Sequence, residues 1–166
     1  MKKNKNITQK RKYLLFSIAF LGMIVCTISC GKSIEKENSS QEIAKQFLEQ
    51  IFTSNYEERY TNFLEDEDLE TYYKTFSNCT SQECIEELQQ NRIPMKYDKK
   101  ANEKQVYCVV SDVKVEFDET ETGTFEVFLT VDNNESSELK KATGQLKVEN
   151  GQITNFFLSN IVPYKE

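Results

Sequence analysis

The apolar residues of this 166-residue chain change their spacing near residue 106, and this change constrains the fold more than any other feature. Before it, apolar side chains recur at intervals of three and four residues, the spacing of one helix face. After it they alternate with polar side chains, the spacing of a strand with one buried side. Helices followed by strands favour an α+β domain, with about three N-terminal helices packed on one face of an antiparallel sheet.

Helix starts are marked at several places before residue 94. Capping boxes, in which a Ser or Thr and the Glu three residues later cap each other's backbone N–H groups, stand at 39–42, 54–57 and 80–83. The acidic run 65–68 favours a further start, because carboxylates stabilise the positive end of a helix dipole. Pro94 is expected to end the last helix.

Four strands are expected after the helices. Alternation over 113–117, 125–131 and 142–148 predicts the first three, and 152–161 the fourth, with turns at 118–124 and at Asn133-Asn134. Asn150-Gly151 is the strongest hairpin signal, because both residues accept the positive φ of a type I′ turn. The strands would form a four-stranded antiparallel meander.

This layout of helices and then a curved sheet resembles the nuclear-transport-factor-like cone fold, also called cystatin-like. The resemblance covers about residues 41–163 and rests on the order of elements rather than on a motif. That family includes enzymes, ligand-binding pockets and interaction modules, so the implied fold does not choose a function.

The first 31 residues differ in charge from the rest of the chain. Six of the first twelve residues are Lys or Arg, and residues 13–31 carry no charge. From Cys30 onward, 15 basic residues stand against 27 acidic ones, a net charge of −12. A basic head before an apolar run is typical of an export signal. The run is also nearly long enough to span a bilayer, so a cleaved signal and a retained anchor both remain open.

The apolar run ends in Thr-Ile-Ser-Cys-Gly, which resembles the lipobox of a bacterial lipoprotein signal peptide. In that family the Cys thiol receives a diacylglyceryl group, and a peptidase cuts just before it. Ile28 and Ser29 fit the pattern, whereas Thr27 stands where Leu is usual. The resemblance implies a signal peptide over 1–29, cleavage between Ser29 and Cys30, and lipidation of Cys30. Two acyl chains would hold the protein stably on the outer face of the cytoplasmic membrane.

Residues 30–40 would then be the lipidated Cys and a flexible tether, because they contain one large apolar residue and no periodicity. A single extracytoplasmic domain would occupy 41–166. Its cysteines could form disulfides in an oxidising compartment.

The three cysteines of that domain suggest one disulfide. With Thr80 as the N-cap of the last helix, Cys79 and Cys84 occupy N′ and N4, the two positions that touch in a hydrophobic staple. This spacing predicts a Cys79–Cys84 disulfide, in which case Cys108 would have no cysteine partner in the domain. Pairing of Cys108 with either partner, or three free buried thiols, are the alternatives. The Cys-x4-Cys spacing does not fit a Cys-x-x-Cys redox motif.

Composition excludes several functions. The chain contains no His, which excludes Ser–His–Asp and Cys–His catalysis and His-ligated zinc. Its five Gly are scattered, so it has no glycine-rich phosphate loop. A sequence pI near 5.0 argues against nucleic-acid binding.

The remaining candidates for chemistry are weak. The acidic run Glu65–Asp68 could attract a divalent cation but lacks the Gly and the spacing of a calcium loop. An isomerase of the cone fold would need a carboxylate and tyrosines, for which only Tyr72, Tyr73, Tyr107 and Asp112 are available. Aromatic residues at this spacing are typical of a core. We therefore expect no catalytic residue, no metal and no cofactor.

Three classes of function remain open. The first is a non-catalytic interaction module that binds another envelope protein, and we expect it because nothing catalytic converges and tethering strengthens weak contacts. The second is a small-ligand-binding protein that uses the mouth between helices and sheet, which an apolar cavity would favour. The third is a small isomerase or hydrolase, which a buried carboxylate with a raised pKa would favour.

Overall fold

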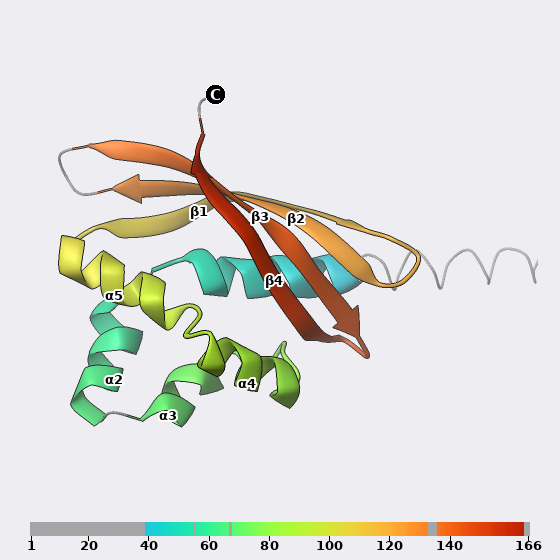
Figure 1. Ribbon diagram of the computed structural model, residues 1–166, viewed down its shortest axis with the longest axis horizontal. Coiled ribbons are helices and arrows are strands. Elements are labelled where there is room, and N and C mark those ends of the chain that lie inside the picture. The colour runs from blue at the N-terminus through green and yellow to red at the C-terminus, as the bar shows by residue number, and fades with distance from the viewer. Residues whose placement is uncertain (1–38, 55, 67, 133–135, 165–166) are drawn as a thin grey trace, which may run out of the picture. The chain divides into compact units, whose positions relative to one another are not determined.

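Every strand of the structure follows the last helix, as the change of apolar spacing predicts. The computed structural model describes residues 39–54, 56–66, 68–132 and 136–164 (Figure 1). The strands are β1 (Tyr107–Phe117), β2 (Thr122–Asp132), β3 (Ser137–Glu149) and β4 (Gln152–Pro163). They form one sheet in the order β1-β2-β3-β4, with every neighbouring pair antiparallel. The predicted α+β class and four-stranded antiparallel meander are confirmed.

The turn between β3 and β4 has the predicted chemistry. Asn150 has φ of 52° and Gly151 has φ of 77°, so both lie in the left-handed region that a type I′ turn requires. Asn and Gly tolerate this region better than other residues, which is why the turn could be predicted from the sequence. The turn predicted at Asn133-Asn134 lies outside the described residues.

The helical part contains more segments than the three that were predicted. Residues 39–52 form the first described helix. A π-helix, η1 (Tyr56–Tyr60), runs directly into α2 (Thr61–Asp66), and α3 (Leu69–Lys74) and α4 (Gln82–Gln90) follow. The helix α5 (Met95–Lys104) was not predicted at all. Pro94 follows the end of α4 at Gln90, and it also stands at the N-cap position of α5.

Two of the three predicted helix starts that follow the first helix differ from the structure. Asp68 caps α3 as expected, accepting a hydrogen bond from the Glu70 N–H. Among the described residues Ser54 forms no N-cap bond, and its hydroxyl instead accepts the Cys108 N–H at 2.8 Å, which ties the end of helix 39–52 to β1. The N-cap of α4 is Ser81 rather than Thr80.

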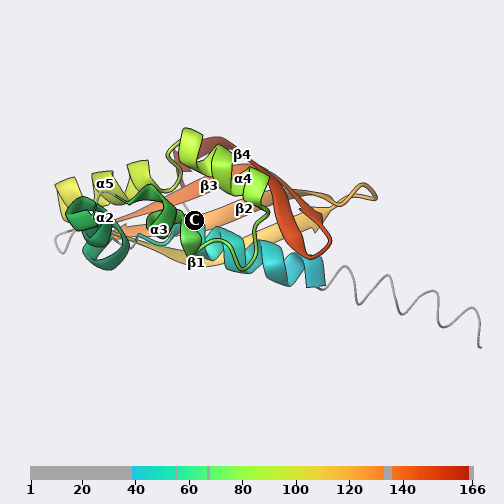
Figure 2. The same ribbon diagram turned by 90° about the horizontal axis from the view of Figure 1, so that it is seen from below.

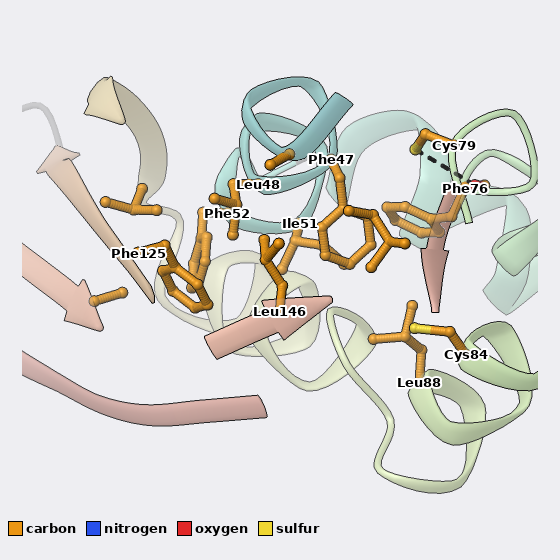
Figure 3. Packing of buried hydrophobic residues seen from close by; sticks show 14 of the residues in the cluster. Phe47, Leu48, Ile51, Phe52, Phe76, Cys79, Cys84, Leu88, Phe125 and Leu146 are labelled. Atoms are coloured by element: carbon orange, nitrogen blue, oxygen red, sulfur yellow. Dashed lines mark hydrogen bonds between the residues drawn. The ribbon is translucent and has the colours of Figure 1, made fainter. Parts of the chain in front are cut away.

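Helix 39–52 packs its apolar stripe on the sheet, and the helices lie on one side of it (Figures 1 and 2). Phe47 meets Phe156 of β4 edge-to-face, with 5.3 Å between ring centroids. Phe125 of β2 stacks on the same Phe156 ring at 5.6 Å. Phe52 tilts against Phe125, and Figure 3 shows these two rings next to each other. Aromatic pairs in these geometries add to the stabilisation from apolar burial, so this cluster fixes the helix on the sheet.

A glycine in β3 allows that cluster to close. The register between β3 and β4 shifts at Thr143/Gly144, which is typical of a β-bulge. A Cβ added at Gly144 would overlap the Phe157 carbonyl oxygen and lie 2.6 Å from the Phe125 ring. Glycine is therefore required here by close approach of the backbone of β4 and of an aromatic ring.

We expect Gly144→Ala to destabilise the domain by about 2 kcal/mol or more, because a backbone oxygen and a packed ring must move. Chemical denaturation of the purified protein, followed by circular dichroism, measures the loss. Gln145→Ala is the matched control, since Gln145 is the exposed neighbour in the same strand. Equal midpoints for Gly144→Ala and the control would contradict this account.

Candidate functional site

The carboxylate of Asp98 on α5 is buried, and its residue is 1% exposed. Its Oδ2 accepts a hydrogen bond from Arg59 Nε at 2.7 Å and another from the Tyr72 hydroxyl at 2.6 Å. Arg59 belongs to η1 and Tyr72 to α3. A single buried oxygen therefore joins three separate helical segments.

Arg59 extends this cluster to a fourth segment. Its Nη1 donates to the carbonyl oxygen of Gln50 in helix 39–52 at 3.2 Å. The guanidinium lies 5.3 Å from the ring centroids of both Tyr72 and Phe76, within the range of cation–π attraction. Burial alone would lower the pKa of Arg59, but the hydrogen bond and the charge of Asp98 outweigh it, and the pKa is raised. Arg59 stays charged, and the cluster is an ion pair in folded protein.

A cavity of about 520 Å³ lies beside this ion pair, between the end of helix 39–52, α5 and the sheet. Its volume falls in the range typical of small-molecule sites. Apolar side chains from five elements form much of its wall, among them the following residues: Ile51, Phe52, Val106, Leu129, Val131 and Ile161. Asp98 also reaches the wall, so the ion pair and the cavity share α5.

The charged residues that line the cavity are mostly basic. Lys100 and Lys104 stand one turn apart on α5, and Lys140 comes from β3. Glu138 pairs with Lys140 at 3.2 Å, and Asp98 is paired with Arg59. Within the part of the chain that the structure describes, neither Lys100 nor Lys104 forms an ion pair. The cavity thus has a mixed apolar and polar lining, with the exposed Lys100 and Lys104 at its rim.

Cys108 also lines the cavity, as a half-buried free thiol. Burial raises its pKa to about 11, while Lys140 opposes the rise and Asp98 adds to it. The thiol is therefore protonated near neutral pH. A protonated thiol is a poor nucleophile, so Cys108 contributes to the wall rather than to chemistry.

The predicted Cys79–Cys84 disulfide is absent from the structure, where both residues are buried free thiols. Figure 3 shows Cys79 beside Phe76 and Cys84 beside Leu88. Burial raises the pKa of both thiols, that of Cys84 to about 12. Because Ser81 is the N-cap, Cys79 and Cys84 occupy N″ and N3, and these are not the positions that touch in a staple.

The N-cap is Ser81 rather than Thr80 because of a contact with a residue that is distant in sequence. Thr80 forms a parallel β-bridge with Ile153 of β4. The Ile153 N–H donates to the Cys79 carbonyl oxygen at 2.7 Å, and the Ser81 N–H donates to the Ile153 carbonyl oxygen at 2.9 Å. These bonds hold the segment extended through Ser81, so α4 starts one residue later than the capping box suggests.

The residues considered for an isomerase do not converge. Tyr72 and Tyr73 are buried on α3, and burial raises the pKa of each. Tyr107 lies at the start of β1 and donates to Glu57 at 2.6 Å, whereas Asp112 is exposed and accepts the Val113 N–H. The Tyr72 hydroxyl instead donates to Asp98, a carboxylate that was not predicted from the sequence.

The acidic run considered for a cation is used as a helix cap. Asp68 accepts hydrogen bonds from Glu70 and Thr71, and these hydrogen bonds lower its pKa. Among the described residues no group of three or more His, Cys, Asp or Glu could hold a metal ion.

The predictions for the N-terminal segment concern residues that the structure does not describe. Ser29, Cys30, the signal peptide and most of the tether all lie outside the described range. No helix within the described range is long and apolar enough to cross a membrane.

No protein-family model matches this chain, and no curated protein or solved structure is significantly similar to it. The candidate site is therefore defined by its own geometry, which is the ion pair and the cavity beside it.

We expect Asp98→Asn to destabilise the domain by about 3 kcal/mol or more, because it leaves the Arg59 guanidinium buried without its counter-charge. Tyr72→Phe is the matched comparison, since it removes only one hydrogen-bond donor, and we expect it to cost about 1 kcal/mol. Chemical denaturation monitored by circular dichroism gives both values. If Asp98→Asn cost no more than Tyr72→Phe, the ion pair would not be the dominant interaction of the cluster.

Proposed function

We propose that this protein is a lipid-anchored extracytoplasmic protein whose domain binds a small, largely apolar ligand without catalysis. The observation that carries the proposal is the cavity of about 520 Å³ between helices and sheet, whose wall includes a group of apolar side chains. It favours ligand binding over the interaction module that the sequence alone favours. A cone-like arrangement, in which helices cover one face of a curved sheet, fits such a cavity.

The groups around the cavity support a binding role rather than a catalytic one. Asp98, the carboxylate on its wall, already accepts hydrogen bonds from Arg59 and Tyr72. Glu138 is paired with Lys140, and the raised pKa of Cys108 keeps its thiol protonated. A general base must take up a proton from the substrate, and each of these side chains already has a cationic partner or its own proton.

The exposed apolar side chains of the sheet give less support to an interaction module. Val109 of β1 is 53% exposed and Phe157 of β4 is 60% exposed. The two strands are the opposite edges of the sheet, so these side chains cannot form one continuous patch. Single exposed apolar residues are normal on protein surfaces, whereas a large patch would mark an interface.

The envelope location rests on the N-terminal sequence. The basic head, the uncharged run over 13–31 and Cys30 support export and lipidation, with the membrane as the partner of the lipid. A second envelope protein remains an expected partner under the interaction-module alternative. Neither proposal involves nucleic acid.

We expect Val131→Phe to block the cavity, because a larger ring would occupy the space lined by Val131. Membranes that carry the full chain are exposed to a neutral long-chain alcohol bearing a photoreactive diazirine. Mass spectrometry of the peptides then locates the label, which we expect on cavity-lining peptides of the unchanged chain and at least tenfold less on Val131→Phe.

Val109→Phe is the matched control, since it makes the same exchange at an exposed position. It should leave labelling unchanged, and resistance to proteolysis shows that both variants are folded. Absence of cavity labelling in the unchanged chain, both by this alcohol and by probes with other headgroups on the same carbon chain, would contradict ligand binding.

We expect Cys30→Ala to abolish lipid attachment, because it removes the sulfur that would carry the diacylglyceryl group. Fractionation of host cells and mass spectrometry of the N-terminal peptide measure this. The variant should be released from membranes or remain an unprocessed precursor, and Cys26→Ala should behave like the unchanged chain. An unchanged chain that still begins at Met1 with an unmodified Cys30 would instead indicate a retained anchor.

A further inference from the structure

One flank of α5 faces the cavity, and it combines apolar and basic side chains. Tyr97, Lys100, Ala101 and Lys104 all line the cavity. They stand at positions i, i+3, i+4 and i+7, which places them on a single helix face. Lys96 and Lys99 do not line the cavity, although they belong to the same helix. The four lysines of α5 are therefore divided between the cavity rim and the solvent.

Positive charge at this place is unusual for the domain. Residues 39–166 contain 13 basic and 25 acidic residues, yet the described residues that line the cavity include three lysines and two carboxylates. Both carboxylates have basic partners, Asp98 in Arg59 and Glu138 in Lys140. Lys100 and Lys104 are left without an ion pair among the described residues. The rim thus offers two cations to a ligand.

The helix dipole explains only part of this arrangement. A cation is favourable in the last turn of a helix, and Lys104 is the last residue of α5. Lys100 stands a full turn earlier, and Lys140 lies on a strand, so that effect does not account for either residue. Long lysine side chains can also extend an apolar wall with their stems while the ammonium group stays at the mouth.

We propose that the ligand is an anionic amphiphile, with an apolar body in the cavity and one carboxylate or phosphate headgroup held by Lys100 and Lys104. The apolar wall removes the body from water, and the two ammonium groups form charge-assisted hydrogen bonds with the headgroup. Lys140 lines the same cavity but is already paired with Glu138, so the proposal assigns the headgroup to the other two lysines. This inference rests on the proposed function, because it names the class of ligand for the same cavity.

The test uses membranes that carry the full chain and three diazirine-bearing probes with the same twelve-carbon chain: a carboxylate, a phosphate monoester and a neutral alcohol. The double variant Lys100→Gln/Lys104→Gln should reduce labelling of cavity peptides by the carboxylate or phosphate probe at least tenfold. It should change labelling by the alcohol less than twofold. The stronger of the two anionic probes identifies the headgroup.

The matched control is Lys96→Gln/Lys99→Gln, which removes the same charge from the same helix outside the cavity and should leave labelling by all three probes unchanged. Equal loss of anionic labelling in both double variants would overturn the inference, because general charge rather than the rim would then be responsible. Undiminished anionic labelling in Lys100→Gln/Lys104→Gln would also overturn it, while alcohol labelling of the cavity would still support the proposed function. Failure of all three probes to label the cavity would overturn the proposed function itself.

Discussion

The ion pair between Arg59 and Asp98 determines where α5 lies, and the cavity depends on α5. An isolated charge buried in a protein interior is strongly unfavourable. If η1 or α5 moved away, Arg59 or Asp98 would remain buried without its counter-charge. Tyr72 and the Gln50 carbonyl oxygen add α3 and helix 39–52 to the same network. The short helices of this domain have little apolar surface of their own, and this network compensates by fixing them to one another.

Fixing α5 through Asp98 also orients the helix about its axis. Met95, Asp98 and Ala101 are its buried residues, spaced three apart. With that face turned inward, the flank that carries Tyr97, Lys100 and Lys104 reaches the cavity. A core of apolar residues alone could give similar stability. The ion pair, however, is satisfied in only one rotation of α5 about its axis, and we infer that fixing this rotation is its role. The buried ion pair and the basic rim are thus two consequences of one helix orientation.

The sheet could be predicted from the sequence and α5 could not, for a physical reason. Strand residues such as Val113, Val115 and Phe125 alternate strictly with polar neighbours, and Asn150-Gly151 identifies its own turn. In α5 the middle residue of the buried face is Asp98, so the apolar spacing that would predict a helix is interrupted. Arg59, thirty-nine residues earlier, and Tyr72, twenty-six residues earlier, make burial of that carboxylate favourable, and local spacing does not reveal such distant partners.

The start of α4 and the cysteine pair show the same limit. Thr80 and Ser81 are both good N-cap residues, and the choice between them comes from the bridge of Thr80 to Ile153, which is distant in sequence. An error of one residue in the cap removes the whole argument for a Cys79–Cys84 bond. For Lys100 and Lys104 the sequence shows a separation of four residues, which is about one turn of a helix. Only the structure shows that this segment is the helix α5 and that the flank with both lysines lines the cavity.

The charge of the domain bears on how such a rim could select a ligand. A net charge of −12 from Cys30 onward repels anions over a range of about 8 Å at physiological ionic strength. An anion that reaches the rim meets Lys100 and Lys104 at contact distance, where screening by salt is weakest. A neutral or cationic amphiphile gains no contact of this kind. Under the proposed lipid anchor, amphiphiles dissolved in the adjacent bilayer would reach the cavity at high local concentration, so modest affinity at the rim would suffice for occupancy.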